Sequence, residues 1–147
     1  MPTATPRIGL PLLSAGQAQK ETTHNEALLL LDAAIAPVVQ AIGIDTPPVA
    51  PSPGQCWIVG ATPAGAWNGQ GNNMAIWTNG GWRFASLPLG SQVTREADGK
   101  RWQRFSDGWH APQTVSAPAA GTTIDNECRS ALTNLITALT NIGLINS

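Results

Sequence analysis

Two pairs of short alternating segments, each joined by a tight turn, constrain the fold more than any other feature. The first pair, "MAIWTN" and "GWRFAS", meets at Asn79-Gly80-Gly81, and the second, "RWQRFS" and "GWHAP", meets at Asp107-Gly108. Asn-Gly and Asp-Gly favour the positive φ angles of hairpin turns, and alternation suits strands with one buried face. These segments predict two β-hairpins. With the strand "QCWIVG" they predict a small antiparallel β domain over residues 44–115.

Tryptophan is the dominant aromatic residue in these hairpins. The chain has six Trp, two Phe and no Tyr. In one interpretation the rings form the core, since each buries about 150–250 Å². In the other, some rings stay exposed beside polar turns and stack on sugars, and Trp67 and Trp109 are then the candidate glycan-binding residues. A stand-alone carbohydrate-binding module that uses exposed Trp is therefore an alternative function.

The N-terminal residues 1–43 are expected to form an arm and a helix. Three prolines keep residues 1–14 extended, and the apolar side chains among them predict packing on the chain's own domain or on a neighbour. A helix is expected within residues 15–41, with Thr23 and Glu26 as a capping box and with an end or kink at Pro37. The proline-rich stretch "IDTPPVAPSPG" (44–54) is expected to be a stiff linker.

The C-terminal residues 116–147 are expected to form a small-residue tether and an oligomerisation helix. Thr122 and Asp125 can cap its start, and Gly143 followed by Leu144 fits its end. Five apolar positions are spaced four, three, four and three residues apart, as in a coiled coil. We call them the seam: Cys128, Leu132, Leu135, Leu139 and Ile142.

The seam has two interpretations. Sister copies cover it in a coiled-coil-like bundle, or the helix folds back onto its own domain. A tether that precedes the helix favours self-association, and Ile136, which widens the apolar stripe, favours three or more helices over two. Two heptads alone make a marginal coil, so other contacts are expected to help.

Composition and spacing exclude several function classes. Charged residues make up 12% of the chain and the net charge is -1, which gives no electrostatic basis for binding nucleic acid or an anionic membrane. The two cysteines form neither a disulfide framework nor a metal-ligand pair, as expected of a chain made in a reducing cytoplasm. His24, Glu26 and Asp32 are candidates for an acid–base set, but residues two apart on a helix, such as His24 and Glu26, point in different directions. No catalytic residue, metal or cofactor is expected, and the chain is predicted not to be an enzyme.

The stretch "LPLLSAGQAQKETTHNEALLLLDAAI" (10–35) resembles the opening of a domain found in phage and prophage proteins of alphaproteobacteria and in gene transfer agent particles. The resemblance continues through the Trp-rich β region and the C-terminal helix. It implies an α+β structural component of the virion: a homotrimeric head or tail fibre or spike. It also implies two kinds of partner besides sister copies, namely a spike or fibre base, capsid or baseplate protein bound through the arm, and in some members host surface glycan.

Overall fold

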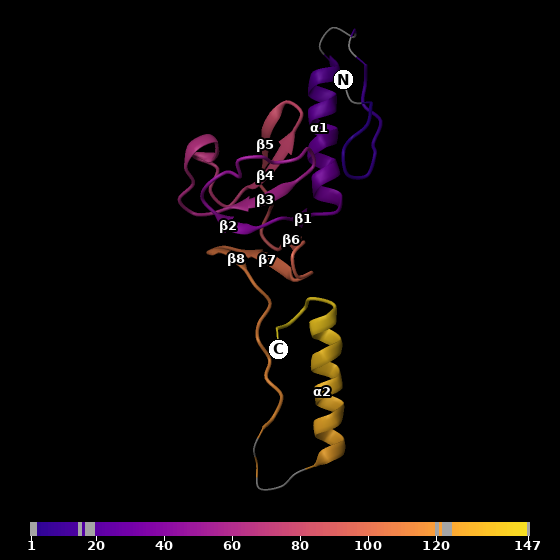
Figure 1. Cartoon of the computed structure of the whole chain (residues 1–147), viewed down its shortest axis with the longest axis vertical. Helices are drawn as coiled ribbons and strands as arrows, with labels where there is room; N and C mark the ends of the chain where they lie inside the picture. The colour runs from indigo at the N-terminus through magenta and orange to yellow at the C-terminus, as the bar shows by residue number, and fades with distance from the viewer. Residues whose placement is uncertain (1–2, 15, 17–19, 120, 122–124, 147) are drawn as a thin grey trace.

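The structure, a computed structural model, describes residues 3–14, 16, 20–119, 121 and 125–146. These residues form an α+β fold, with α1 and the arm at one end, the strands in the middle and α2 at the opposite end (Figure 1). The elements are α1 (Lys20–Ile35), β1 (Val38–Val39), β2 (Ile42–Ile44), β3 (Cys56–Val59), a 3-10 helix (Gly65–Trp67), β4 (Met74–Thr78), β5 (Gly81–Ala85), β6 (Gln92–Arg95), β7 (Arg101–Phe105), β8 (Gly108–His110) and α2 (Asn126–Asn141).

The strands form two four-stranded mixed sheets, with the orders β2-β3-β4-β5 and β1-β6-β7-β8. The prediction of an antiparallel domain was therefore wrong in one respect. β1 pairs with β6 and β2 pairs with β3 in parallel, while the other pairs are antiparallel. Both parallel pairs come from the segment that follows α1, which supplies one edge strand to each sheet.

Helix α1 ends at Ile35, just before Pro37, so the predicted end at this proline is confirmed. The residue before a proline is biased toward extended backbone, so Pro37 stops the helix and leaves residues 38–44 free to form β1 and β2. The predicted division between residues 43 and 44 lies inside β2. The proline-rich stretch is thus a connection within the β structure, and the carboxylate of Asp45 accepts hydrogen bonds from the backbone N–H and the hydroxyl of Thr62.

Both predicted hairpins are confirmed. β4 and β5 pair from Met74–Ala85 to Thr78–Gly81, which leaves Asn79-Gly80 as the turn. β7 and β8 meet at the pair Phe105–Gly108, so their turn is Ser106-Asp107, one residue earlier than predicted. Strand β6 was not predicted; it pairs with β7 across the turn formed by residues 96–100.

The β2–β5 sheet is buried on both faces. One face packs with α1 and the other sheet in a cluster of Ala33, Val39, Cys56, Ile58, Met74, Ile76 and Val93. The other face carries four of the six tryptophans, whose neighbouring rings lie 4.9–6.4 Å apart between centroids in tilted and edge-to-face contacts. Such contacts favour aromatic rings. The core interpretation of these tryptophans is therefore the one that the structure supports.

The arm packs on its own domain through one buried carboxylate. Asp32 of α1 is 1% exposed. It accepts hydrogen bonds from the Thr5 hydroxyl at 2.8 Å and from the backbone N–H groups of Arg7 at 3.0 Å and Ile8 at 2.9 Å. A carboxylate can be buried at low cost when its lone pairs are filled in this way. Asp32 therefore holds the arm in a loop against α1.

The side chain of Arg7 fixes the same loop from the other side. Its guanidinium donates to the backbone oxygens of Ala36, Val38 and Gly54, and to the sulfur of Cys56 at 3.2 Å. Burial raises the pKa of the Cys56 thiol, and the nearby guanidinium opposes that effect. Cys56 is accordingly a protonated core residue that helps to seat the arm.

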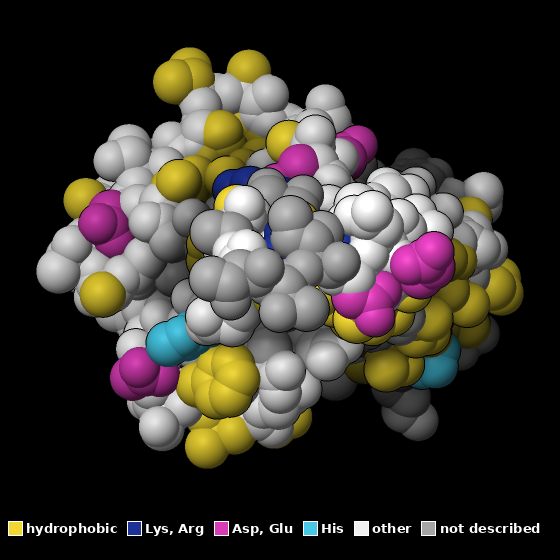
Figure 2. Space-filling model, turned by 90° about the horizontal axis from the view of Figure 1, so that it is seen from below, with side chains coloured by type: hydrophobic (Ala, Val, Ile, Leu, Met, Phe, Trp, Pro, Cys, Tyr) yellow, Lys and Arg dark blue, Asp and Glu magenta, His cyan; other side chains and the backbone are white. Residues whose placement is uncertain are grey.

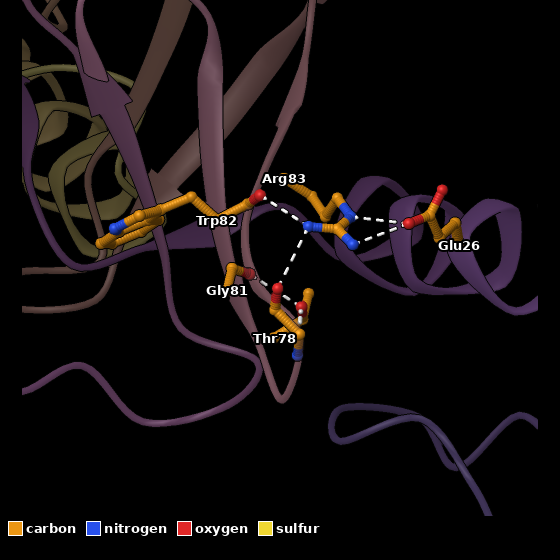
Figure 3. A network of polar contacts seen from close by, with 6 residues as sticks. Glu26, Thr78, Gly81, Trp82 and Arg83 are labelled. Carbon is orange, nitrogen blue, oxygen red and sulfur yellow. Dashed lines mark hydrogen bonds and ion pairs between the residues drawn. The ribbon is translucent and has the colours of Figure 1, made fainter. Parts of the chain in front are cut away.

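Glu26 joins α1 to the β4–β5 hairpin. Its Oε1 accepts hydrogen bonds from Nε and Nη2 of Arg83, at 3.0 and 2.7 Å, while Nη1 of Arg83 donates to the Trp82 carbonyl (Figure 3). The predicted capping box was wrong, because α1 begins at Lys20 and Thr23 lies inside the helix. Glu26 instead makes a tertiary contact with Arg83.

Candidate functional site

Helix α2 begins at a well-defined cap. Asp125 has extended backbone, and its carboxylate accepts a hydrogen bond of 2.8 Å from the backbone N–H of Cys128. This contact satisfies one of the amides that a helix start leaves unpaired, and it places a negative charge at the positive end of the helix dipole. Thr122, the other predicted capping residue, lies outside the described residues.

The predicted end of α2 at Gly143 is confirmed. Gly143 has φ 72°, its N–H donates to the Thr140 carbonyl, and the N–H of Leu144 donates to the Leu139 carbonyl. This pair of bonds is the Schellman motif, which needs a left-handed residue and therefore favours glycine. A Cβ at this position would also lie 2.4 Å from the carbonyl oxygen of Gly99, so only glycine fits against the β6–β7 turn.

The C-terminal end of α2 is anchored to the rest of the chain at two points. The carbonyl of Gly143 accepts a 3.0 Å hydrogen bond from the N–H of Arg101, at the start of β7. Asn146 pairs with the segment that leaves β8: its N–H donates to Gln113 and its carbonyl accepts from Val115. Residues 111–119 thus extend away from the sheets, and α2 returns toward them. This part of the chain forms the end of the molecule opposite α1 (Figure 1).

Helix α2 has two sides with different surroundings. Its own chain covers one face: Ile136 is 6% exposed, and the guanidinium of Arg129 donates to the Pro118 carbonyl at 3.0 Å. An α-helix turns about 100° per residue, which places Ile136 about 100° around the helix from Leu135 of the seam. The fold-back interpretation therefore accounts for Ile136 and leaves the seam unexplained.

The seam is largely exposed. Leu132, Leu135 and Ile142 are 39%, 54% and 51% exposed. Cys128 is exposed as well, and Leu139 is half-buried. Large aliphatic side chains on one stripe of a helix are a feature of surfaces that another molecule covers. The view from the α2 end shows several groups of hydrophobic side chains on this face of the molecule and little Lys or Arg (Figure 2).

The structure does not place the two predicted glycan-binding tryptophans on the surface as a pair. The expectation that Trp67 is open to a ligand was wrong, because the 3-10 helix turns this residue inward and its exposure is 0%. Its ring packs edge-to-face on Trp82. Trp109 is half-buried against the core, and its Nε1 donates to the Asn72 carbonyl at 3.2 Å. Neither indole presents a free face and a free N–H together.

No group of three or more His, Cys, Asp or Glu side chains in the described part of the chain is arranged to hold a metal ion. In the same part of the chain, neither helix has the length and hydropathy to cross a bilayer.

The fold and the C-terminal unit together define an α+β domain with two mixed sheets and an appended helix whose apolar stripe is uncovered. The chain belongs to a family described as a protein of unknown function (DUF2793), whose model matches residues 24–110. The match runs from α1 to the last residue of β8, so it covers both sheets. No curated protein and no solved structure matches the chain.

Proposed function

We propose that this protein is a structural subunit of a phage or gene transfer agent particle, a head or tail fibre or spike whose copies associate through the seam of α2. The observation that carries the proposal is the exposure of Leu132, Leu135 and Ile142 on a helix that its own chain holds by a different face. Leaving three such side chains in water is costly, at about 25 cal/mol per Å² of apolar surface. Association of sister helices would remove that cost.

The proposed number of copies is three. Ile136 no longer supports this number, because its own chain covers it. The number rests on the resemblance of residues 10–35 to the particle domain described above, whose members are generally homotrimeric. An arrangement around one axis also suits the anchoring at Gly143, because parallel helices would keep all three α+β domains on the same side of the bundle.

The proposed attachment surface lies at the end opposite α2. Four apolar side chains of the arm and α1 are exposed, at 46%, 37%, 52% and 63%: Ile8, Leu13, Leu31 and Ile35. We assign this surface to a base, capsid or baseplate protein of the particle. The arm itself is held by Asp32, so the partner would meet a preformed loop and lose little entropy in ordering it.

The proposal assigns no catalytic residue, metal or cofactor, and it places the protein in the virion. A carbohydrate-binding module based on exposed tryptophan has lost its main support, because Trp67 is buried in the aromatic cluster.

The particle role is tested on particles from the cell that encodes the chain. After density-gradient purification, mass spectrometry is expected to find this chain in the particle fraction. Its copy number per particle, calibrated on a particle protein of known copy number, is expected to be a multiple of three. An empty-vector strain that lacks the gene is the control. If particles purified from cells that express the chain contain no copy of it, the proposed structural role is wrong.

A further inference from the structure

A groove of about 670 Å³ lies between the outer surface of the β7–β8 hairpin and the place where the chain leaves β8. Its lining includes Arg101, Gln103, Phe105, Asp107, His110 and Leu144. We propose that this groove binds a sugar ring of a saccharide. The proposal goes beyond the structural role proposed above: it stands on the groove's own geometry and does not require the trimer.

Strand alternation explains why these side chains share one face. Along β7, Trp102 packs against the core and the guanidinium of Arg104 donates to the Asn72 carbonyl, so both point toward the body. The alternate residues at 101, 103 and 105 face the groove, and Gln103 pairs across the sheet with His110 of β8. Rigid strands therefore hold the groove.

The groove has an exposed aromatic ring that its neighbours hold in place. Phe105 is 47% exposed, and its ring meets the His110 ring edge-to-face with 5.0 Å between centroids. Nε2 of His110 lies 2.9 Å from Oδ1 of Asp107, which fixes the imidazole. The apolar C–H face of a sugar ring suits such a platform.

Two polar side chains beside this ring have no partner in the part of the chain that the structure describes. The guanidinium of Arg101 and the side-chain amide of Gln103 make no hydrogen bond or ion pair with the residues that the structure describes. An amide, a guanidinium and a carboxylate offer donors and acceptors to adjacent hydroxyls. Apolar and polar groups that converge in one concavity are typical of small-ligand sites. A hydroxyl-rich ring with one apolar face matches this combination better than a purely apolar or purely anionic ligand.

The test is a titration of the full chain with trisaccharides of glucose, galactose, N-acetylglucosamine and glucuronic acid, followed by the backbone amide NMR signals of β7 and β8. At least one sugar is expected to shift these signals at millimolar concentration. Phe105→Ala should weaken that binding about tenfold, and Gln103→Ala should weaken it too. Leu89→Ala, which removes an apolar side chain that is 65% exposed outside the groove, is the matched control.

Two results would overturn the proposal: no shift with any of the four sugars, or binding that Phe105→Ala and Gln103→Ala leave unchanged while unfolding curves show both variants folded. The native mass of each sample separates this failure from failure of the proposed function. If the protein is a trimer that binds no sugar, only the proposal of a sugar site is contradicted. If it is a monomer that binds sugar, the sugar site is supported and assembly through the seam is contradicted.

Discussion

Leu135→Asp is expected to convert the assembled protein into monomers. Leu135 is 54% exposed in the single chain, so a carboxylate there is solvated and the monomer keeps its fold. In a closed bundle the same carboxylate would be surrounded by apolar neighbours, where an unpaired charge is strongly disfavoured. We expect the dissociation constant to rise at least about 100-fold, which corresponds to about 2.7 kcal/mol. Sedimentation velocity over a range of concentrations measures it.

Ser130→Asp is the matched control for this change. Ser130 is exposed on the same helix and lies on the side opposite the seam, so the same carboxylate there should leave the assembly intact. Circular dichroism of both variants checks that α2 persists. Equal sedimentation of Leu135→Asp and the unmodified chain would mean that the seam is not the surface through which copies meet.

Asp32→Ala is expected to lower the free energy of unfolding by about 3 kcal/mol. The substitution removes the acceptor of three hydrogen bonds, from the Thr5 hydroxyl and from the N–H groups of Arg7 and Ile8. Each such bond contributes about 1 kcal/mol, and donors left buried without a partner add to the cost. Urea unfolding followed by tryptophan fluorescence gives the value, since most of the tryptophans lie in or against the core.

Asp98→Asn serves as the comparison for Asp32→Ala. Asp98 forms an ion pair with Arg95 at the β6–β7 turn, at the surface, and exposed pairs of this kind contribute less than about 1 kcal/mol. If Asp32→Ala cost no more than Asp98→Asn, the arm would be held by something other than this carboxylate.

Local signals made the hairpins and both ends of α2 predictable. Asn79-Gly80 specifies a tight turn by its own backbone preferences, and Asp125 and Gly143 act within one turn of the helix that they terminate. Such features are determined by residues adjacent in the sequence, so they do not depend on the tertiary contacts of the rest of the chain. The same is true of the stop that Pro37 imposes on α1.

Features set by distant contacts were not predictable. β1 and β2 are two and three residues long and pair in parallel with strands far along the chain, so their short sequences carry no period. Trp67 stands in a glycine-rich loop that suggests exposure, yet a single 3-10 turn directs it into the aromatic cluster. Glu26 had the spacing of a cap, but Arg83, brought close by the fold, is its partner.

The candidate sites divide in the same way. The helical spacing of the seam was visible, because it is a property of one helix. Which side of α2 the chain itself covers depended on the path of residues 111–119, and Ile136 lies on that covered side. The groove at Phe105 was missed, although the alternation in "RWQRF" already separates Phe105 from Trp102.

The native mass of the unmodified chain, measured by sedimentation equilibrium at micromolar concentration, tests the central claim most directly. One chain has a mass of 15.3 kDa, so three copies predict about 46 kDa. A mass of 15.3 kDa across the concentration range would contradict assembly through α2, and the exposed stripe of that helix would then need another partner to cover it.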